Sequence, residues 1–545
     1  MKKRLVGLLL SIAILCTLVA PVAVAEAPTT ITWLHQSWDV SGLDHWYDAL
    51  WVKELETRLN VDFEFISVNS TDNYDNVVNL NIAGGDYPDI ISWNWSNYSG
   101  GIEAAIEDGL VLPFTVAELQ EKVPNYYNLI ANNDYINRAL TLTDGTIAAF
   151  CHVEESTARN AYSGYAIRKD WLDRLNLAVP TTIDELYNVL VAFKEQDANG
   201  NGDANDEMAM SDRSSLNLTK ELAAAWGLIY NYPQLDPETG KVTYWTEVND
   251  GKNFRDFTLT MRKWYAEGLI DPSFTSNTQT EINSQVTSDI QGFWHTNTNR
   301  FPGYYTLLKD TVAAYADGAA VKLEPLPRFP YQYAAEGTEA KRYTQATNLK
   351  NYVAAQEANV ITSAAVEAGK VDKILELFNY MYSEEGTTLI SWGVEGVSFD
   401  YTEDGSKVWK DVVLNNEGGL SSDTVMQYCI PTRGEFPKIM DLRAWMTVDC
   451  AHPDGQRELD FNYGADKDLI IPNILLTGED AETYNMIMND VNTAIAETFL
   501  SVVIGNKDEA AIDKLFKTID GMGIQEALDI YTKVYENYLN KEIVK

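Results

Sequence analysis

One acidic loop holds the residues whose types and spacing are best suited to a specific chemistry. Its oxygen-bearing side chains alternate with small residues, with Asp197, Asn199 and Asn201 at loop positions one, three and five. Gly202 occupies position six, where a calcium-binding loop makes its sharp turn, and the Asp203 carbonyl oxygen would be the ligand at position seven. Because Ca²⁺ prefers six to eight oxygen ligands, this spacing predicts a structural calcium site.

The end of this loop departs from the helix–loop–helix calcium pattern, which has a bidentate Glu at position twelve. Met208 stands at that position, directly after Asp206 and Glu207. We expect the last two carboxylates to complete the predicted ligand set of Asp197, Asn199, Asn201, Asp203, Asp206 and Glu207. The alternative is an ordinary acidic turn without a metal. In either case the role of the loop is structural and not catalytic.

Tryptophans beside polar residues form a second candidate site. Sugars present weakly polar C–H faces and hydroxyl groups, so their binding sites combine flat aromatic rings with Asp, Asn, Glu or Arg side chains. Several tryptophans follow strand-like runs, where the clefts of α/β proteins open. The predicted sugar-binding residues are Trp38, Trp93, Asn94, Trp95, Asn97, Trp226, Trp294, His295 and Trp392. The alternative for each tryptophan is a place in the hydrophobic core.

No residue pattern in the sequence indicates catalysis. The sequence contains no G-x-S-x-G, H-E-x-x-H, P-loop or dinucleotide-binding motif, and its five histidines are scattered. Paired carboxylates are sufficient for glycoside hydrolysis. With 80 acidic residues, however, a pair such as Glu154 and Glu155 is not a specific signal. We therefore predict a binding protein with no catalytic residues, and a secreted carbohydrate hydrolase is the alternative.

Short strands and helices alternate in the segment that must position these residues. We expect strands at 30–34, 61–68 and 88–92, with helices at 49–59 and 74–83 between them. This order predicts an α/β fold with a mostly parallel sheet and helices on both faces. Strongly helical segments are expected later, at 182–194, 254–267, 365–383, 481–501 and 524–539.

Six motifs occur in order between residues 30 and 540. The most informative is Tyr165–Met208, which reads YAIRKDWLDRLNLAVPTTIDELYNVLVAFKEQDANGNGDANDEM. The other five are Gly84–Asp89, Glu107–Pro113, Asp144–Ile147, Trp264–Pro272 and Gly393–Gly396. Together they resemble the family 1 extracellular solute-binding proteins of ABC importers, the large oligosaccharide-binding type with a calcium loop.

This resemblance implies a periplasmic-binding-protein-like fold with two lobes that close about a hinge. It places 28–152 plus 345–398 in an N-terminal lobe and 155–342 plus 402–545 in a C-terminal lobe. The chain would cross between the lobes near 151–157, 343–353 and 399–402. The implied function is delivery of an oligosaccharide to the permease subunits of an ABC transporter by cleft closure. We expect the protein to be a monomer.

The charge of the chain limits its partners. With 41 basic and 80 acidic residues, the formal net charge is −39. Phosphate binding needs a basic face, so nucleic acid is not an expected partner. A neutral ligand fits this charge best, and an anionic polysaccharide would need a local basic pocket.

The first 25 residues are predicted to be a secretory signal peptide. A basic start at Lys2, Lys3 and Arg4 precedes an apolar run at 5–20 and the small residues of Ala23–Ala25. We therefore expect a secreted, extracellular protein that associates with the cell surface through the transporter. An uncleaved membrane anchor and a lipid anchor at Cys16 are alternatives.

Cleavage of this signal would leave three cysteines, Cys151, Cys429 and Cys450. So few cysteines in a large chain indicate that burial, and not a disulfide framework, stabilises the fold. The sequence leaves a single Cys429–Cys450 disulfide open.

Overall fold

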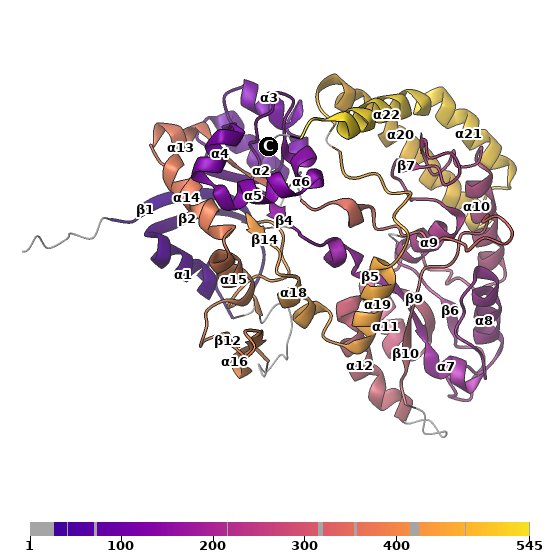
Figure 1. Ribbon diagram of the computed structural model, residues 1–545. Helices are drawn as coiled ribbons and strands as arrows, with labels where there is room; N and C mark the ends of the chain where they lie inside the picture. Colours follow the sequence, from indigo (N-terminus) through magenta and orange to yellow (C-terminus); the bar gives the residue numbers. More distant parts are fainter. Residues whose placement is uncertain are drawn as a thin grey trace, which may run out of the picture.

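The computed structural model describes residues 27–40, 42–69, 74–214, 216–313, 320–353, 357–414, 425–474 and 476–543. The predicted signal peptide and Cys16 lie outside these ranges. The described chain folds into two α/β lobes that lie side by side and are joined by crossing segments (Figure 1). Among the described helices, none has both the length and the apolar character that a membrane span requires.

The first lobe is built on a four-stranded sheet with the order β11–β3–β1–β2. β1 (Thr29–Ser37) pairs in parallel with β2 (Val61–Asn69) and with β3 (Ile90–Asn94), whereas β11 (Glu357–Ile361) is antiparallel to β3. The predicted alternation of strands and helices at the start of the chain is thereby confirmed.

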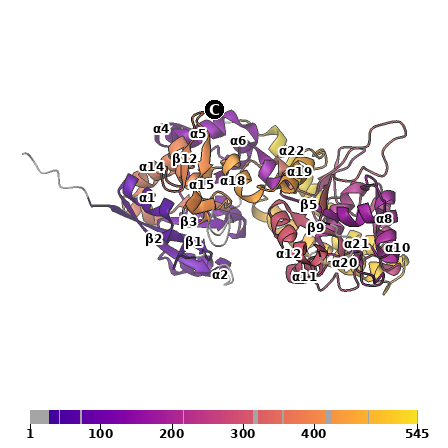
Figure 2. The same ribbon diagram turned by 90° about the horizontal axis from the view of Figure 1, so that it is seen from below.

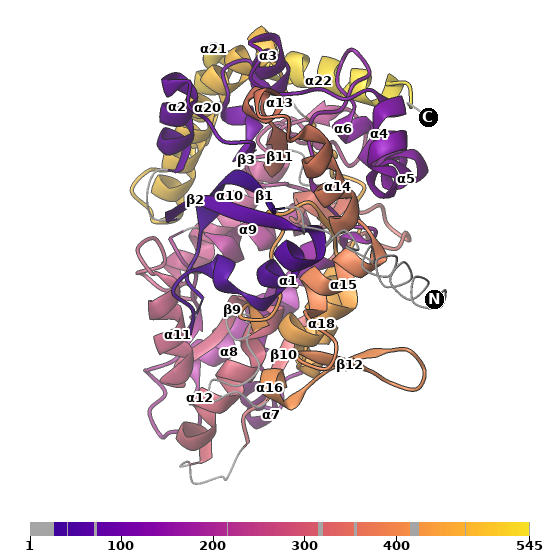
Figure 3. The same ribbon diagram turned by 90° about the vertical axis from the view of Figure 1, so that its left-hand side faces the viewer.

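Two helices connect the parallel strands of this sheet, α1 (Leu50–Leu59) and α2 (Tyr74–Gly84). The connections from β1 to β2 and from β2 to β3 run in opposite directions across the sheet. Right-handed crossovers therefore put the two helices on opposite faces, as Figure 3 shows. The other helices of this lobe are α3 (Gly101–Glu107), α4 (Val116–Lys122), α5 (Pro124–Asn132), α6 (Asp134–Leu140), α13 (Ser363–Glu367), α14 (Val371–Met381) and α15 (Glu384–Trp392).

The second lobe has a mixed four-stranded sheet with the order β10–β5–β9–β6. β9 (Gln291–Asn297) is antiparallel to β5 (Ser163–Arg168) and parallel to β6 (Met208–Met210), and β10 (Leu323–Leu326) is antiparallel to β5. Its helices are α7 (Lys169–Arg174), α8 (Ile183–Glu195), α9 (Asn217–Ala223), α10 (Lys252–Ala266), α11 (Gln279–Thr287), α12 (Phe301–Ala313), α19 (Pro453–Tyr463), α20 (Gly478–Val503), α21 (Ala510–Met522) and α22 (Ile524–Asn540).

Short elements complete the two lobes and their connections. The strands are β4 (His152–Val153), β7 (Gln234–Leu235), β8 (Val242–Thr243), β12 (Phe399–Tyr401), β13 (Lys407–Trp409) and β14 (Lys438–Ile439). The helices are α16 (Asp411–Leu414) and α18 (Leu442–Asp449). The 3-10 turns are η1 (Trp46–Asp48), η2 (Trp95–Asn97), η3 (Thr157–Ala161), η4 (Ala224–Trp226), η5 (Thr298–Arg300) and η6 (Thr347–Lys350).

Three segments cross between the lobes and meet in a small hydrophobic cluster. The first runs through β4 and η3, the second through η6, and the third through β14 and α18, which lies at the junction of the lobes in Figure 2. β4 and β14 pair in parallel, and Val153 bridges to Val353 of the second crossing. We call the shared apolar group the hinge cluster; its buried members are Ala161, Leu349, Met440, Trp445, Cys450, Leu459 and Ile470.

The third crossing lies later in the chain than the sequence led us to expect. The sequence predicts that 402–545 belongs to the second lobe, but Met426, Ile430 and Phe436 belong to the core of the first. The Phe436 ring packs against those of Trp33 and Trp51, at centroid distances of 5.6 and 5.2 Å. This segment therefore stays on the first lobe because its apolar side chains complete that core.

Each lobe has its own hydrophobic core, formed mainly by residues around its sheet and helices. The three cysteines outside the signal segment are buried and free, so the disulfide left open for Cys429 and Cys450 does not form. Cys450 lies in the hinge cluster, and Cys429 lies in a separate group around Trp392. These three cysteines therefore add buried apolar surface to the fold and no covalent cross-link.

Candidate functional site

Strand pairing fixes which ends of the two sheets face the crossings. Glu357, which begins β11 after the second crossing, pairs with Asn94 at the carboxyl end of β3. In the second lobe Ser163, which follows the first crossing, pairs with Asn297 at the carboxyl end of β9. The carboxyl ends of β3 and β9 therefore lie on either side of the crossings, which is where open α/β sheets bind their ligands.

Four of the predicted sugar-binding residues lie together at the end of β3, and two of them bond to Asp75. Trp93 Nε1 and Asn97 Nδ2 donate hydrogen bonds to Asp75 Oδ1, at 2.8 and 3.1 Å. Trp95 Nε1 donates to the carbonyl oxygen of Ala358, and Asn94 Oδ1 accepts from the Ser96 backbone. Both indole rings are buried, so neither presents an open face to a ligand.

The remaining predicted tryptophans are not brought together. Trp38 belongs to the core of the first lobe, and Trp226 packs against Phe257 in the core of the second. Trp294 is fully buried in a third apolar group, beside Tyr304. Trp392 is buried in a fourth, where its Nε1 donates to Asp441 Oδ2. Stacking on a sugar needs an exposed ring face, so this structure places these rings in the core, in contrast to the predicted platforms.

His295 is the predicted residue whose surroundings are most unusual. His295 is half-buried and lies on β9, two residues before the carboxyl end of the strand. Burial is the main cause that lowers the pKa of His295, to about 3, and the positive charges of Arg213, Arg328, Arg300 and Lys220 lower it further. The imidazole is therefore neutral at physiological pH, and it stands among cations.

Sequence reasoning missed these cations. Arg213 follows β6, Lys220 lies on α9, and Arg300 ends η5, so they come from three separate segments. The local spacing of the sequence gives no sign that they meet. Only the parallel pairing of β6 with β9 places the segments that follow both strands at one edge.

The first crossing carries a polar network around Glu154. The Glu154 carboxylate accepts hydrogen bonds from Arg159 Nη1 and Asn160 Nδ2, each at 3.2 Å. Asn348 of the second crossing donates to Asn160 Oδ1, so the network joins two crossings. Because Glu154 is buried and held by these partners, its role here is to join the crossings to one another.

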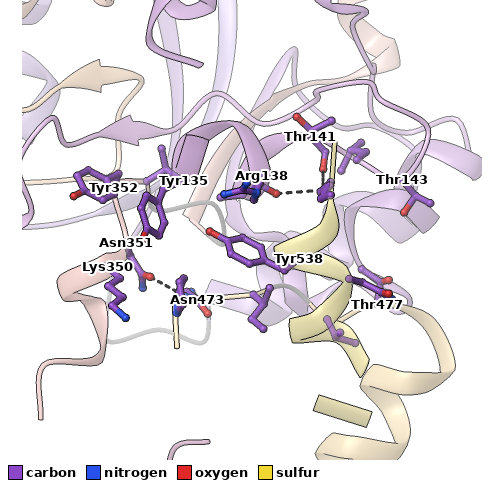
Figure 4. A pocket seen from close by; sticks show the side chains of 18 of the residues that line it. Tyr135, Arg138, Thr141, Thr143, Lys350, Asn351, Tyr352, Asn473, Thr477 and Tyr538 are labelled. Atoms are coloured by element: carbon purple, nitrogen blue, oxygen red, sulfur yellow. Dashed lines mark hydrogen bonds between the residues drawn. The ribbon is translucent and has the colours of Figure 1, made fainter. Parts of the chain in front are cut away.

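A cavity of about 460 Å³ lies between the lobes, next to the second crossing (Figure 4). Tyr135 and Arg138 of α6 line it from the first lobe, and Tyr538 and Lys541 from the second. Lys541 Nζ donates hydrogen bonds to the carbonyl oxygens of Arg138 and Thr141 and so ties the end of α22 to α6. The volume is in the range of small-molecule sites, but none of the predicted sugar-binding residues is among those that line it.

The predicted calcium loop folds so that its side chains turn inward. Asp197 accepts hydrogen bonds from the backbone amides of Gly200 and Gly202. Asn199 Nδ2 and Asn201 Nδ2 donate to the two carboxylate oxygens of Asp206, at 3.1 and 2.6 Å. Gly202 has φ +96°, a left-handed conformation that favours glycine at this turn.

The donor set of this loop fits a hard cation. Glu207 Oε1 accepts from the Ala198 amide, whereas Glu207 Oε2 is buried without a hydrogen-bond partner. Burial raises the pKa of the Glu207 carboxyl, which a cation would reverse. Rotating the side-chain amide groups of Asn199 and Asn201 by 180° would direct their oxygen atoms at a cation beside Asp206. In the described chain, however, no three His, Cys, Asp or Glu side chains are close enough to form a metal-binding group.

The chain resembles known proteins over most of its length, although no family model matches it. It is 25% identical over 508 residues to the fructooligosaccharide ABC transporter substrate-binding protein FusA of Streptococcus pneumoniae serotype 4, covering 89% of this chain and 86% of the relative. It is 27% identical over 363 residues to the polygalacturonan/rhamnogalacturonan-binding protein YtcQ of Bacillus subtilis. That match covers 65% of this chain and 64% of the relative.

Solved structures with the same fold include an extracellular solute-binding protein from Bifidobacterium longum subsp. infantis. Its TM-score is 0.71 at 20% identity, with 94% of this chain and 99% of that chain covered. FusA in complex with kestose gives a TM-score of 0.69 at 21% identity, and an EF-hand mutant of FusA gives 0.68 at 21%. Both FusA structures cover 94% of this chain and 100% of their own.

Proposed function

We propose that this chain, a homologue of the substrate-binding proteins of ABC transporters, binds an oligosaccharide between its lobes and delivers it to the transporter unchanged. The observation that carries this proposal is the near full-length likeness of a two-lobed chain to FusA, which binds kestose. YtcQ, the second relative, is named as a polygalacturonan/rhamnogalacturonan-binding protein.

The two-lobed architecture suits a protein that captures a ligand by closing its lobes around it. Each lobe has a separate core, and the crossings meet in the small hinge cluster, so the lobes can rotate as bodies about it. A ligand between the carboxyl ends of β3 and β9 would contact both lobes. Its binding energy would then favour a closed arrangement that a transporter can recognise.

The protein would act outside the cell, exported by its signal peptide, as a monomer that docks on the permease subunits of an ABC transporter. It would carry out no chemistry, and none of the observations above favours the hydrolase alternative.

We also propose that the 197–207 loop holds a structural Ca²⁺ ion. The inward side chains, the buried Glu207 oxygen without a partner and the glycine turn support this proposal. The EF-hand named for FusA adds to it. Oxygen ligands would come from the side chains of Asp197, Asn199, Asn201, Asp206 and Glu207 and from the Asp203 carbonyl. The ion would hold the loop within the second lobe, between α8 and β6.

A thermal-shift screen of the purified protein with oligosaccharides, followed by small-angle scattering, tests this function. Ligand at one hundred times its dissociation constant should stabilise the protein by about 2.7 kcal/mol. The radius of gyration should fall as the lobes close. A panel of neutral and acidic oligosaccharides that leaves both the melting temperature and the scattering curve unchanged would refute the proposal.

A further inference from the structure

The side chain of Lys541 reaches from the second lobe to the first. Lys541 directly follows α22, whose Ile524 and Leu528 side chains belong to the core of the second lobe. Its Nζ donates hydrogen bonds to the carbonyl oxygen of Arg138, at 3.2 Å, and to that of Thr141. Both oxygens lie at the carboxyl end of α6, a helix that packs into the core of the first lobe. This contact therefore joins the lobes directly, outside the crossings.

The carboxyl end of α6 is well suited to hold an ammonium group. The last four carbonyl oxygens of a helix have no partner within the helix, and they form the negative end of its dipole. Arg138 and Thr141 supply two of these oxygens. Burial lowers the pKa of Lys541, and the charge of Glu103, on α3 of the first lobe, opposes that shift. These groups that favour the Lys541 ammonium all belong to the first lobe.

This contact and the carboxyl ends of the two sheets lie on opposite sides of the hinge. In Figures 2 and 3, α6 and the end of α22 lie on one side of α18, whereas β3 and β9 lie on the other. No hydrogen bond or ion pair joins residues 90–97, at the end of β3, to residues 291–300, at the end of β9, all of which the structure describes. The Lys541 contact thus bridges the lobes on the side away from the proposed ligand cleft.

The cavity of about 460 Å³ lies beside this contact (Figure 4). Tyr135 of α6 and Tyr538 of α22 line it from the two lobes. Atoms that line a void lose the dispersion contacts that close packing would supply. The attachment of α22 to α6 therefore depends more on the hydrogen bonds of Lys541 than on apolar packing.

Closure of the lobes about the crossings must break this attachment. A rotation that brings the carboxyl ends of β3 and β9 together moves the lobes apart on the opposite side of the hinge, where Lys541 meets α6. We propose that Lys541 is a latch that holds the lobes open and thereby weakens ligand binding in the cleft without touching the ligand. The effect on affinity rests on the proposed function, because part of the binding energy must then break the latch.

The first measurement follows the latch without any ligand. Spin labels attached at Leu80→Cys on α2 and Leu307→Cys on α12 report the distance between the lobes on the side of β3 and β9 (Figure 3). Both positions are exposed, and the three cysteines of the described chain are buried and should not react. Double electron–electron resonance should show a larger population of short distances in Lys541→Met than in the wild type.

Two further variants are controls for this measurement. Lys541→Arg keeps the positive charge and the donors, so it should keep the wild-type distances. Lys533→Met removes a lysine from the same helix, but the ion pair of Lys533 with Asp480, at 2.8 Å, lies within the second lobe. This variant should also keep the wild-type distances. Melting temperatures of the ligand-free proteins identify any variant that loses its fold.

The second measurement is the affinity of the same proteins for kestose and trigalacturonate, which follow the sugars named for FusA and YtcQ. Lys541→Met should bind the sugar roughly three- to tenfold more tightly than the wild type, because apparent affinity rises with the fraction of molecules in the binding-competent arrangement. A purely structural role of Lys541 does not predict this gain, since a destabilised fold cannot tighten binding.

Unchanged distances in Lys541→Met, or an equal change in Lys533→Met, would overturn the inference. A weaker affinity of Lys541→Met for the sugar that the wild type binds would overturn it as well. Shorter distances in Lys541→Met, with neither sugar bound by any of these proteins, would support the latch and count against the proposed function.

Discussion

The guanidinium of Arg433 lies 4.2 Å from the centre of the Trp38 ring, against which Trp46 also stacks with 4.4 Å between centroids. These contacts, with the edge of His35 at 5.6 Å, leave Trp38 only 8% exposed. The segment that carries Arg433 also inserts Phe436, which stacks on His35 at 4.4 Å. A segment late in the chain therefore covers the end of β1 and makes Trp38 part of the core.

Truncation of Trp38 should reduce stability and not affinity. Removing a buried tryptophan costs about 3–5 kcal/mol, so Trp38→Ala should unfold at a much lower denaturant concentration than the wild type. The fraction that stays folded should bind the oligosaccharide with unchanged affinity. A variant with the wild-type melting temperature and a tenfold weaker affinity would instead make Trp38 a sugar platform.

The sequence predicted the elements of the first lobe better than the surroundings of its tryptophans. Polar neighbours of Trp93 suggested an exposed cleft. In the structure, Ser92 accepts a hydrogen bond from Trp33 Nε1 and donates one to Asn359, so these polar groups pair within the core. Polarity along a strand therefore does not report exposure when the polar side chains find buried partners.

The 197–207 loop and the cations near His295 show which sites a sequence can reveal and which it cannot. The 197–207 loop was recognisable because all its donors lie within eleven consecutive residues. Arg213 and Arg300 are joined only by the pairing of β6 with β9, a long-range register that periodicity does not encode. The sequence also places the third crossing too early in the chain. Phe436 keeps its segment on the first lobe by packing against residues some 400 positions away in the sequence.

Removal of Ca²⁺ should destabilise the second lobe. A chelator should lower the melting temperature of the wild type, because an ion at one hundred times its dissociation constant contributes about 2.7 kcal/mol. Asp197→Ala should lower it as well and should abolish the response to chelator.

Asp203→Asn is the matched control for this site. The Asp203 carboxylate accepts from the Asn205 amide, so its backbone carbonyl and not its side chain would bind the ion. The control should therefore still respond to chelator. A wild-type melting curve that is identical with and without chelator would show that the loop is an acidic turn without a metal.

The buried imidazole of His152 should make stability depend on pH. Burial, with Lys438 and Arg159 nearby, lowers the pKa of His152 to about 4, against the attraction of Glu154. In the unfolded chain the pKa is about 6.5. Between these values the unfolded state binds a proton that the folded state does not. Stability is therefore lost as pH falls, by about 2 kcal/mol between pH 7 and pH 5 for this histidine.

Denaturant unfolding of the wild type and His152→Gln at both pH values isolates this contribution. Other buried groups titrate in the same window, for instance Asp449, whose pKa burial raises to about 6 and whose effect has the opposite sign. The difference between the two proteins removes these shared contributions. An identical pH dependence for wild type and variant would mean that His152 does not titrate in this way.

Gly455 should tolerate no side chain, because α19 approaches η5 closely there. A Cβ atom at this position would lie 2.3 Å from the carbonyl oxygen of Thr298. We expect Gly455→Ala to destabilise the protein by about 1–3 kcal/mol. Gly303→Ala, on α12 with no atom within 4 Å of the added methyl, should be neutral or stabilise by up to about 1 kcal/mol. Equal stability of the two variants, measured by denaturant unfolding, would contradict this close approach.

The most direct test of the account is one titration followed by recovery of the sugar. The purified protein is titrated calorimetrically with an oligosaccharide that shifts its melting temperature, held with it for a day, and the sugar is then analysed by mass spectrometry. We predict saturable binding of one sugar per protein, with a dissociation constant of about 1 μM or below, corresponding to about −8 kcal/mol. The recovered oligosaccharide should have its original length. Shortened products that form in proportion to the protein present would contradict the account and identify a hydrolase.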